Sequence, residues 1–589
     1  MPGPSASPER APAAPPRAPA PRPAGPAASI PPGAISPLVP VLVPLALAAI
    51  AIGFLFSRLF PFSAEAGYAP AVRFTDVTED AGIAFVTDSG AREDEDTPTT
   101  LAGAVAFLDY DNDGRPDLFF VSGTTWPWTR SAMGGPPTCA LYRNNGNGRF
   151  SDVTREAGLD ITMLGMGVAV GDYDGDGYPD IFIAGIGGNR LFHNLGNGRF
   201  ADVTQEAGVG GDDHVWSTGA VWIDIFGEGR LDLVVCNYAR WSSEASLREA
   251  FVAQSEGPSY TAPTGFVSAF PSVYRNLGNG RFAEVSARTG LNLIDRQTGF
   301  PRALPLAVAA VDANGDGRLD LLFTYQTGED VLFLNQGDGT FRQWKPSAER
   351  REGASAALAG ASELSRPGQA ADRLGILRAA GLALGPSSGE AESHCELRGR
   401  LGVALLDYDL DGRMDIVSGN GLMEPGLTRF EHGRSFAAAP TLLWNDGRAW
   451  QRAPGGAVLG GRMVARGVAV ADVEGNGSLD IAIAQNGGPP RLLRNDQRLH
   501  HAWLRVDLVG THCQRDAGGA RVEVHTPRGV LVQTMEPAMG FMAQSEKTLT
   551  FGLGEDDRVR SVVVRWPSGV RQEIRAPGIN RRLVITEPN

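Results

Sequence analysis

The stretch GAVAFLDYDNDGRPDLFF, from Gly103 to Phe120, decides the fold because variants of it return along most of the chain. It consists of an apolar run, a loop with an acidic residue at every second position, and another apolar run. Such runs around Asp-Gly turns are typical of antiparallel hairpins, and helical periodicity is absent. The further copies are GVAVGDYDGDGYPDIFI (Gly167–Ile183), GAVWIDIFGEGRLDLVV (Gly219–Val235), LAVAAVDANGDGRLDLLF (Leu306–Phe323), GVALLDYDLDGRMDIVS (Gly402–Ser418) and GVAVADVEGNGSLDIAI (Gly467–Ile483).

Asn-Gly turns and closing strands follow these copies, as in LYRNNGNGRFSDVTREAG (Leu141–Gly158). The copies do not begin and end evenly: an orphan closing strand, RFTDVTEDAG (Arg73–Gly82), precedes the first, and the last breaks off at RLLRND (Arg491–Asp496). The early strand can therefore complete the last sheet and close a ring. We predict an all-β fold with a β-propeller of six or seven blades, because closure protects the strand edges. An open solenoid is the alternative.

The acidic loops, numbered one to six in chain order, have the composition of cation sites. Alternate carboxylates along a tight loop converge on one point, and oxygen ligands favour Ca²⁺ before Mg²⁺. In the third loop Phe226 and Glu228 replace two of the aspartates, so we expect weak binding or none there. The predicted metal ligands are Asp109, Asp111, Asp113, Asp117, Asp172, Asp174, Asp176, Asp180, Asp312, Asn314, Asp316, Asp320, Asp407, Asp409, Asp411, Asp415, Asp472, Glu474, Asn476 and Asp480.

The N-terminal region predicts export. Residues 1–34 form a Pro/Ala-rich tail, and residues 35–60 contain an apolar run, Pro37–Phe56, long enough for a transmembrane helix. The segment is an uncleaved anchor or a signal cleaved near Ala66, and both alternatives place the bulk in the periplasm or outside the cell. We assign residues 70–497 to the propeller and 498–589 to a small β-rich C-terminal domain. Insertions at Arg240–Pro271 and around 345–400, the latter with an expected helical part, interrupt the repeat.

The repeated frame D-x-D-x-D-G-x-x-D resembles FG-GAP (VCBS) repeats of integrin-type propellers. The C-terminal segments HAWLRVDLVGTHCQRDAGGARVEV, GFMAQSEKTLTFGLG and VVVRWPSGVRQEI resemble the ASPIC/UnbV domain. Together they are similar to the cartilage acidic protein family, with a bacterial-type member fitting better than an animal one. This resemblance implies an extracellular calcium-binding propeller followed by a β-rich module.

The composition argues against several classes of function. A net charge of −14 argues against a general nucleic-acid binder, and the four cysteines form no CxxC pair, although disulfides remain open. No Ser-His-Asp arrangement, phosphate loop or histidine cluster with ligand spacing stands out. We therefore expect an exported calcium-binding scaffold for adhesion or protein interaction, with a protein or glycan partner. The alternatives are a propeller-based enzyme and an accessory protein of specialised-metabolite biosynthesis.

Overall fold

The computed structural model describes residues 69–70, 72–87, 102–124, 137–242, 267–294, 301, 304–325, 330–345, 400–421, 435–454, 456–536 and 542–589. All of these belong to one compact unit, Tyr68–Asn589. The predicted tail, the anchor, the cleavage position and most of both insertions lie outside the described residues. Within the described ranges, no helix has the length and apolar character needed to cross a membrane.

The described chain is all-β, which confirms the predicted class. Its helices are single turns: α3 (Thr154–Ala157), α4 (Thr204–Ala207), α8 (Gly456–Leu459) and a 3-10 turn at Ser286–Arg288. Of the cysteines, those at 139, 236 and 513 are buried free thiols, and the fourth lies outside the described ranges.

The repeat strands group into six antiparallel units of four, each with its acidic loop between the first and second strands; one further pairing, Trp216 with Ile186, joins the second and third units into an eight-stranded sheet. The units are β2 (Ala104–Leu108), β3 (Asp117–Val121), β4 (Ala140–Asn144) and β5 (Phe150–Asp152); β6 (Leu164–Gly171), β7 (Asp180–Ile186), β8 (Arg190–Asn194) and β9 (Phe200–Asp202); β10 (Val215–Ile223), β11 (Asp232–Arg240), β12 (Ser272–Asn276) and β13 (Phe282–Glu284); β14 (Pro305–Val311), β15 (Asp320–Tyr325), β16 (Val331–Asn335) and β17 (Phe341–Gln343); β18 (Arg400–Leu406), β19 (Asp415–Asn420), β20 (Thr441–Asn445) and β21 (Trp450–Arg452); and β22 (Ala465–Ala471), β23 (Asp480–Gln485), β24 (Arg491–Asn495) and β1 (Phe74–Asp76).

The last unit takes its fourth strand from the start of the repeat region. Strand β1 pairs antiparallel with β24, with Phe74 opposite Asn495. A side-chain bond supports this pairing, because Thr75 Oγ1 donates a hydrogen bond to the carboxylate of Asp496. The prediction that the orphan strand completes the last sheet is therefore confirmed.

Apolar cores join five pairs of neighbouring units, because side chains alternate along a strand and each sheet has an apolar side chain on either face. In the core between the first two units, Phe119 packs with Val168; in the core between the sixth and the first, Val105 packs with Ala469. Similar cores join the second unit to the third, the third to the fourth and the fifth to the sixth. Each large apolar side chain buried in this way contributes roughly 1.5–3 kcal/mol.

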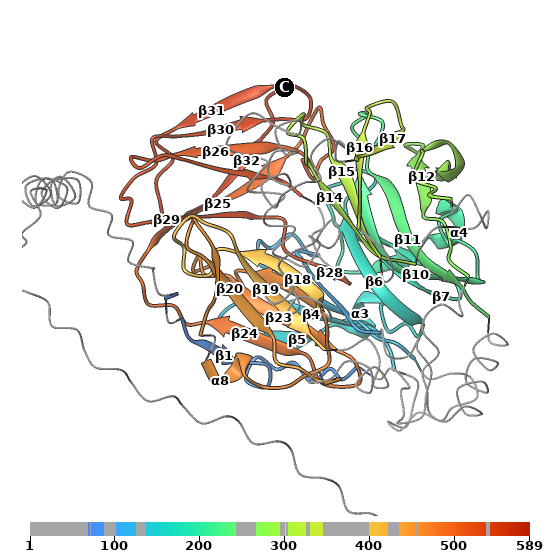
Figure 1. Cartoon of the computed structure of the whole chain (residues 1–589), viewed down its shortest axis with the longest axis horizontal. Helices are drawn as coiled ribbons and strands as arrows, with labels where there is room; N and C mark the ends of the chain where they lie inside the picture. The colour runs from blue at the N-terminus through green and yellow to red at the C-terminus, as the bar shows by residue number, and fades with distance from the viewer. Residues whose placement is uncertain are drawn as a thin grey trace, which may run out of the picture. The chain divides into compact units, whose positions relative to one another are not determined.

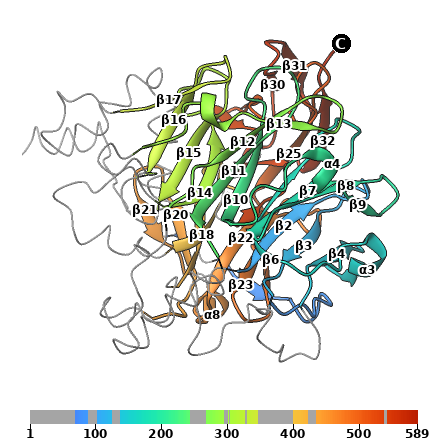
Figure 2. The same ribbon diagram turned by 90° about the vertical axis from the view of Figure 1, so that its right-hand side faces the viewer.

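The first strand of each unit lies toward the middle of the repeat region (Figure 2). These strands contact one another in the order β18, β22, β2, β6, β10, β14. Residues 346–399, between the fourth and fifth units, lie outside the described ranges. The described contacts thus connect the six units in one continuous series from the fifth unit to the fourth. In this series the sixth unit, at the end of the repeat, lies next to the first.

The remaining strands form the C-terminal domain, whose two sheets enclose one apolar core (Figure 1). A short strand, β28, leaves this domain and pairs in parallel with β2, with Ala543 opposite Val105. The C-terminal domain is therefore attached to the innermost strands of the repeat region. Its strands are β25 (Ala502–Val509), β26 (Arg521–His525), β27 (Val530–Thr534), β28 (Ala543–Gln544), β29 (Leu549–Gly554), β30 (Ser561–Arg565), β31 (Arg571–Arg575) and β32 (Arg581–Thr586).

An asparagine ends the third strand of each unit, and in the first, second, third and sixth units its buried amide also donates to a neighbouring unit. Asn144 Nδ2 donates to the Val473 carbonyl of the sixth unit at 3.0 Å and to the Pro116 carbonyl at 3.1 Å. From the sequence, this asparagine is identifiable only as part of a turn. The corresponding bonds between units run from Asn194 to Tyr110 (2.9 Å), from Asn276 to Tyr173 (2.7 Å) and from Asn495 to Tyr408 (2.9 Å).

Replacing Asn144 by alanine should lower the free energy of unfolding by about 1–3 kcal/mol, because the Val473 carbonyl loses its donor in a buried place. Asn335→Ala is the matched control, since the Asn335 amide donates to Leu319 within its own unit at 3.2 Å. Urea unfolding of both full-length variants measures the difference. Equal losses would show that the bond to the sixth unit contributes nothing.

Candidate metal centres

Backbone hydrogen bonds hold the first and last carboxylates of each acidic loop in place. In the first loop, Asp109 accepts from the amides of Asp113 and Gly114, each at 2.9 Å. Asp117 accepts from the amides of Tyr110 at 3.1 Å and Asn144 at 2.7 Å. The reversal depends on Gly114, whose φ of 88° lies in the left-handed region that favours glycine. The backbone thus directs both carboxylates toward the loop centre.

In three loops these carboxylates converge, with one ligand atom of each residue within 4.8 Å of the others. Among the described residues, the acidic side chains of the third, fourth and sixth loops form no such group of three. The groups are Asp109, Asp111 and Asp117 in the first loop; Asp172, Asp174 and Asp176, and also Asp174, Asp180 and His193, at the second; and Asp407, Asp409 and Asp415 in the fifth.

The first loop has a carboxylate oxygen without a partner. Asp111 Oδ1 is buried and accepts no hydrogen bond, whereas Asp113 is paired with Arg115. Burial raises the pKa of Asp117 to about 8 and that of Asp109 to about 6, and the neighbouring carboxylates add to both. The all-oxygen donor set and the unpartnered oxygen fit a hard cation such as Ca²⁺.

The fifth loop is the most deeply buried group. Asp407, Asp409 and Asp415 are 2%, 1% and 0% exposed, and the indole of Trp444 donates to Asp409 Oδ2 at 3.0 Å. Burial and the Asp407 carboxylate raise the pKa of Asp415 to about 10. Because ionised carboxylates at such a site are costly without positive charge, the loop favours either protonation or a bound cation.

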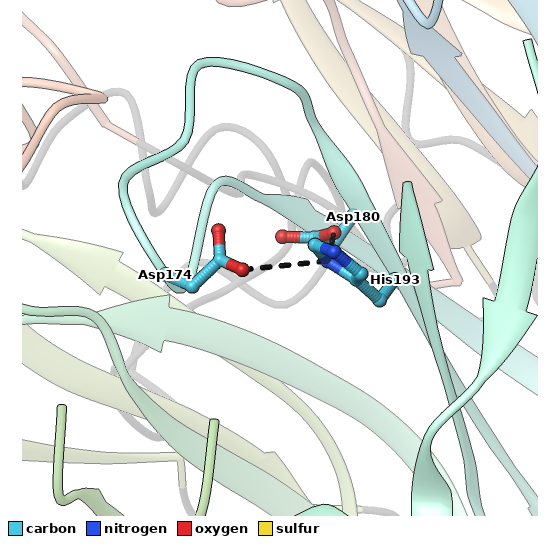
Figure 3. A group of neighbouring side chains, drawn as sticks. All are labelled: Asp174, Asp180 and His193. Carbon is cyan, nitrogen blue, oxygen red and sulfur yellow. Dashed lines mark hydrogen bonds and ion pairs between the residues drawn. The ribbon is translucent and has the colours of Figure 1, made fainter. Parts of the chain in front are cut away.

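At the second loop a histidine from β8 joins the aspartates. His193 Nδ1 lies 3.0 Å from Asp180 Oδ1 and 3.4 Å from Asp174 Oδ2 (Figure 3). His193 was not among the ligands predicted from the sequence. Its place directly before the asparagine of the N-x-G turn is the signal that could have identified it, because that position faces the unit's own loop.

The third loop contains its own positive charge. Arg230 and Arg275 both form ion pairs with Glu228, and the Arg275 guanidinium lies 4.6 Å from the centre of the Phe226 ring. The expectation that the third loop binds metal weakly or not at all stays a prediction.

The fourth and sixth loops use other partners. In the fourth, Asn314 Nδ2 donates to Asp316 Oδ2 at 3.0 Å, and Arg318 pairs with the same carboxylate. In the sixth, Arg505 of the C-terminal domain lies 3.1 Å from Asp472 Oδ2. The ligands predicted in these loops are thus present but engaged with the protein itself.

The buried pair of Arg505 belongs to a wider contact that the sequence did not predict. Arg505 is 3% exposed and also pairs with Glu546, whose Oε1 accepts from the Asp472 amide at 2.9 Å. Residues of the C-terminal domain touch every acidic loop. From the first loop to the sixth, the contacts are Arg582 with Gly114, Arg515 with Asp172, His512 beside Gly229, Gly519 beside Gly317, Gly554 with Leu410, and Arg505 with Asp472.

Replacing Arg505 by leucine should destabilise the protein by about 3–5 kcal/mol, because Asp472 and Glu546 are left as buried carboxylates without their cation. The control is Arg582→Leu, which removes a guanidinium that is 37% exposed and should cost no more than about 1 kcal/mol. Chemical denaturation of both variants tests this contrast. Similar losses of stability in the two variants would show that the buried ion pair contributes no more than the exposed one.

Comparison with known proteins adds family evidence. The ASPIC and UnbV family profile matches residues 510–589, and the FG-GAP-like repeat profile matches residues 109–183, 172–235 and 312–360. Among solved structures, a lectin of Agrocybe aegerita that recognises non-reducing terminal N-acetylglucosamine aligns over 67% of this chain and 81% of its own, at 16% identity. Its TM-score is 0.31, so this likeness carries no argument.

Two curated relatives are named cartilage acidic protein 1. The protein of Xenopus tropicalis is 26% identical over 79% of this chain, and that of Mus musculus is 24% identical over 85%. The aligned parts cover 61% and 76% of those proteins, respectively, so the chain spans less than two thirds of the Xenopus relative. The chain thus carries FG-GAP-like repeats and a C-terminal ASPIC and UnbV domain, with cartilage acidic protein 1 as its curated homologue at low identity.

Proposed function

We propose that the protein is an exported, calcium-binding β-propeller that serves as an adhesion or protein-interaction scaffold. The convergence of Asp407, Asp409 and Asp415 at a buried bend is the observation that carries the calcium part of this proposal. No basic side chain is recorded in an ion pair with these three carboxylates among the described contacts. A divalent cation would supply the positive charge and the ligands would be oxygen atoms, as Ca²⁺ prefers.

The sheet packing supports a propeller. The sixth unit contacts the first through a shared apolar core and through the bond from Asn144 to Val473. Because β1 completes the sixth sheet, the two ends of the repeat are joined as a closed ring requires. Closure between the fourth and fifth units, across residues 346–399, completes the proposed six-bladed ring.

We assign the calcium ions a structural role. The C-terminal domain contacts every acidic loop, so ions bound there would help to hold the repeat region and this domain together. Exported calcium modules have dissociation constants of about 10⁻⁴ to 10⁻³ M. At a concentration ten times the dissociation constant, each site stabilises the folded state by roughly 1.4 kcal/mol, and the three convergent loops together by about 4 kcal/mol. Such sites fill only where calcium is abundant, which supports a location outside the cytoplasm.

Replacing Asp111 by alanine should remove one bound calcium ion and lower the melting temperature in calcium buffer only. In chelator the variant should melt at or slightly above the parent temperature, because a repelling carboxylate has been removed. Glu228→Gln in the third loop is the control and should leave the calcium stoichiometry unchanged. Calorimetry and metal analysis measure both, and an equal loss of stability in chelator would argue against a structural ion.

If the protein is a scaffold, it should bind its partner without converting that partner chemically. We expect the calcium-loaded full chain to bind a protein or glycan on an immobilised array and to lose this binding in chelator as the blades loosen. The matched control is the Asp111→Ala variant, whose binding should require more calcium. Reproducible turnover of an arrayed glycan would favour the enzyme alternative.

A further inference from the structure

In the second, third, fifth and sixth repeat units, the side chain at one matching position approaches that unit's own acidic loop. It is the residue directly before the asparagine that ends the third strand. Arg275 at this position pairs with Glu228, Arg494 approaches Glu474 at 3.8 Å, and Trp444 donates to Asp409. The fold therefore places a donor from the third strand beside the loop. In unit order, the residues at this position are Arg143, His193, Arg275, Leu334, Trp444 and Arg494.

The second unit differs in the chemistry of this residue. A guanidinium stays protonated in proteins and cannot ligate a metal, and neither an indole nor a leucine side chain offers a ligand atom. A neutral imidazole is a common metal ligand. Among the six, only His193 can therefore add a nitrogen ligand to the carboxylates of its loop.

The geometry at His193 is that of a ligand set. His193 Nδ1 lies 3.0 Å from Asp180 Oδ1 and 3.4 Å from Asp174 Oδ2, and the dashed lines of Figure 3 join the imidazole to both carboxylates. Zinc bonds to histidine nitrogen and carboxylate oxygen are about 2.0–2.2 Å long, so neighbouring ligand atoms around a tetrahedral ion lie about 3.3–3.6 Å apart. The separation of 3.4 Å from Asp174 falls in this range. The separation of 3.0 Å from Asp180, at which the imidazole forms a hydrogen bond, needs to lengthen by only about 0.3 Å when a metal replaces the proton.

Neighbouring groups hold the Asp180 carboxylate and the His193 ring in place, and part of the site is exposed to solvent. Asp180 is fully buried and is also held by the amides of Asn194 and Tyr173, at 2.8 and 3.2 Å. The ring of Tyr173 packs edge-on against the imidazole, with centroids 6.1 Å apart. The side chains of Asp174 and His193 are 29% and 22% exposed. A cation could thus enter from this side and keep a water ligand.

We propose that Asp174, Asp180 and His193 form a site for a divalent transition-metal ion of the zinc type. This proposal rests on the proposed role of the acidic loops as cation sites and adds a second metal class to it. A nitrogen ligand favours zinc-type ions, whereas the oxygen-only groups of the first and fifth loops favour calcium. Asp174 also belongs to an oxygen-only group with Asp172 and Asp176, so calcium competes for the same carboxylate.

The test is a competition between metals on the full chain. The protein is stripped with chelator, dialysed against micromolar Zn²⁺ in a millimolar excess of Ca²⁺, and analysed for bound metal. We expect one zinc ion to be retained per chain. Co²⁺ in place of zinc should give visible absorption bands that are lost in the His193→Arg variant. A parent protein that retains no zinc above background would overturn the proposal.

The variants come from the repeat itself. His193→Arg installs the residue of the first, third and sixth units, and His193→Leu installs that of the fourth, so one of them should fold if the other does not. Each should weaken zinc binding by more than about 100-fold, because losing even a hydrogen-bond partner of a ligand costs 10–100-fold. Parent-like zinc affinity in a folded variant would also overturn the proposal.

His214→Gln is the matched control, because His214 lies 3.6 Å from Asp213 on the surface, with a side chain 69% exposed. It should retain zinc like the parent; loss of zinc there would place the site elsewhere. Calcium stabilisation is measured on the same samples. Calcium binding without zinc retention contradicts only this inference, whereas zinc retention without calcium binding contradicts only the calcium proposal.

Discussion

Clustered carboxylates at buried bends are costly when ionised, so each acidic loop requires either protonation or a nearby positive charge. The loop backbone directs Asp109 and Asp117 inward through amide hydrogen bonds, regardless of what neutralises them. The third loop meets the need with Arg275 and the sixth with Arg505. In the first and fifth loops the described contacts leave acidic groups that a dissolved cation would complete. The same loop backbone is thus combined with different sources of positive charge in different units.

The C-terminal domain is part of this electrostatic arrangement. It contributes Arg505 and Arg515 to loops of the repeat region and inserts β28 beside β2. Since a buried cation is stabilised only while its carboxylates remain in place, the repeat region and the C-terminal domain should lose stability together.

Much of the fold could be predicted because it depends on local pattern. Alternating apolar runs and Asp-Gly turns specify hairpins through residues that are neighbours in the sequence. The orphan strand at Phe74 also predicted its own pairing, because an incomplete last sheet leaves one edge available. In contrast, the bonds from Asn144 to Val473 and from Arg582 to Gly114 join residues hundreds of positions apart. No local pattern encodes which loop meets which arginine.

By itself, the sequence determined the strand order, the six acidic loops and the side chains available in each, because these follow from periodicity and residue type. Tertiary structure decided which carboxylates converge, which are paired with arginine, and that His193 stands beside Asp174 and Asp180. The reason is physical: a ligand set or a buried ion pair is defined by distances of a few ångströms. Those distances arise only when separate strands and domains pack together.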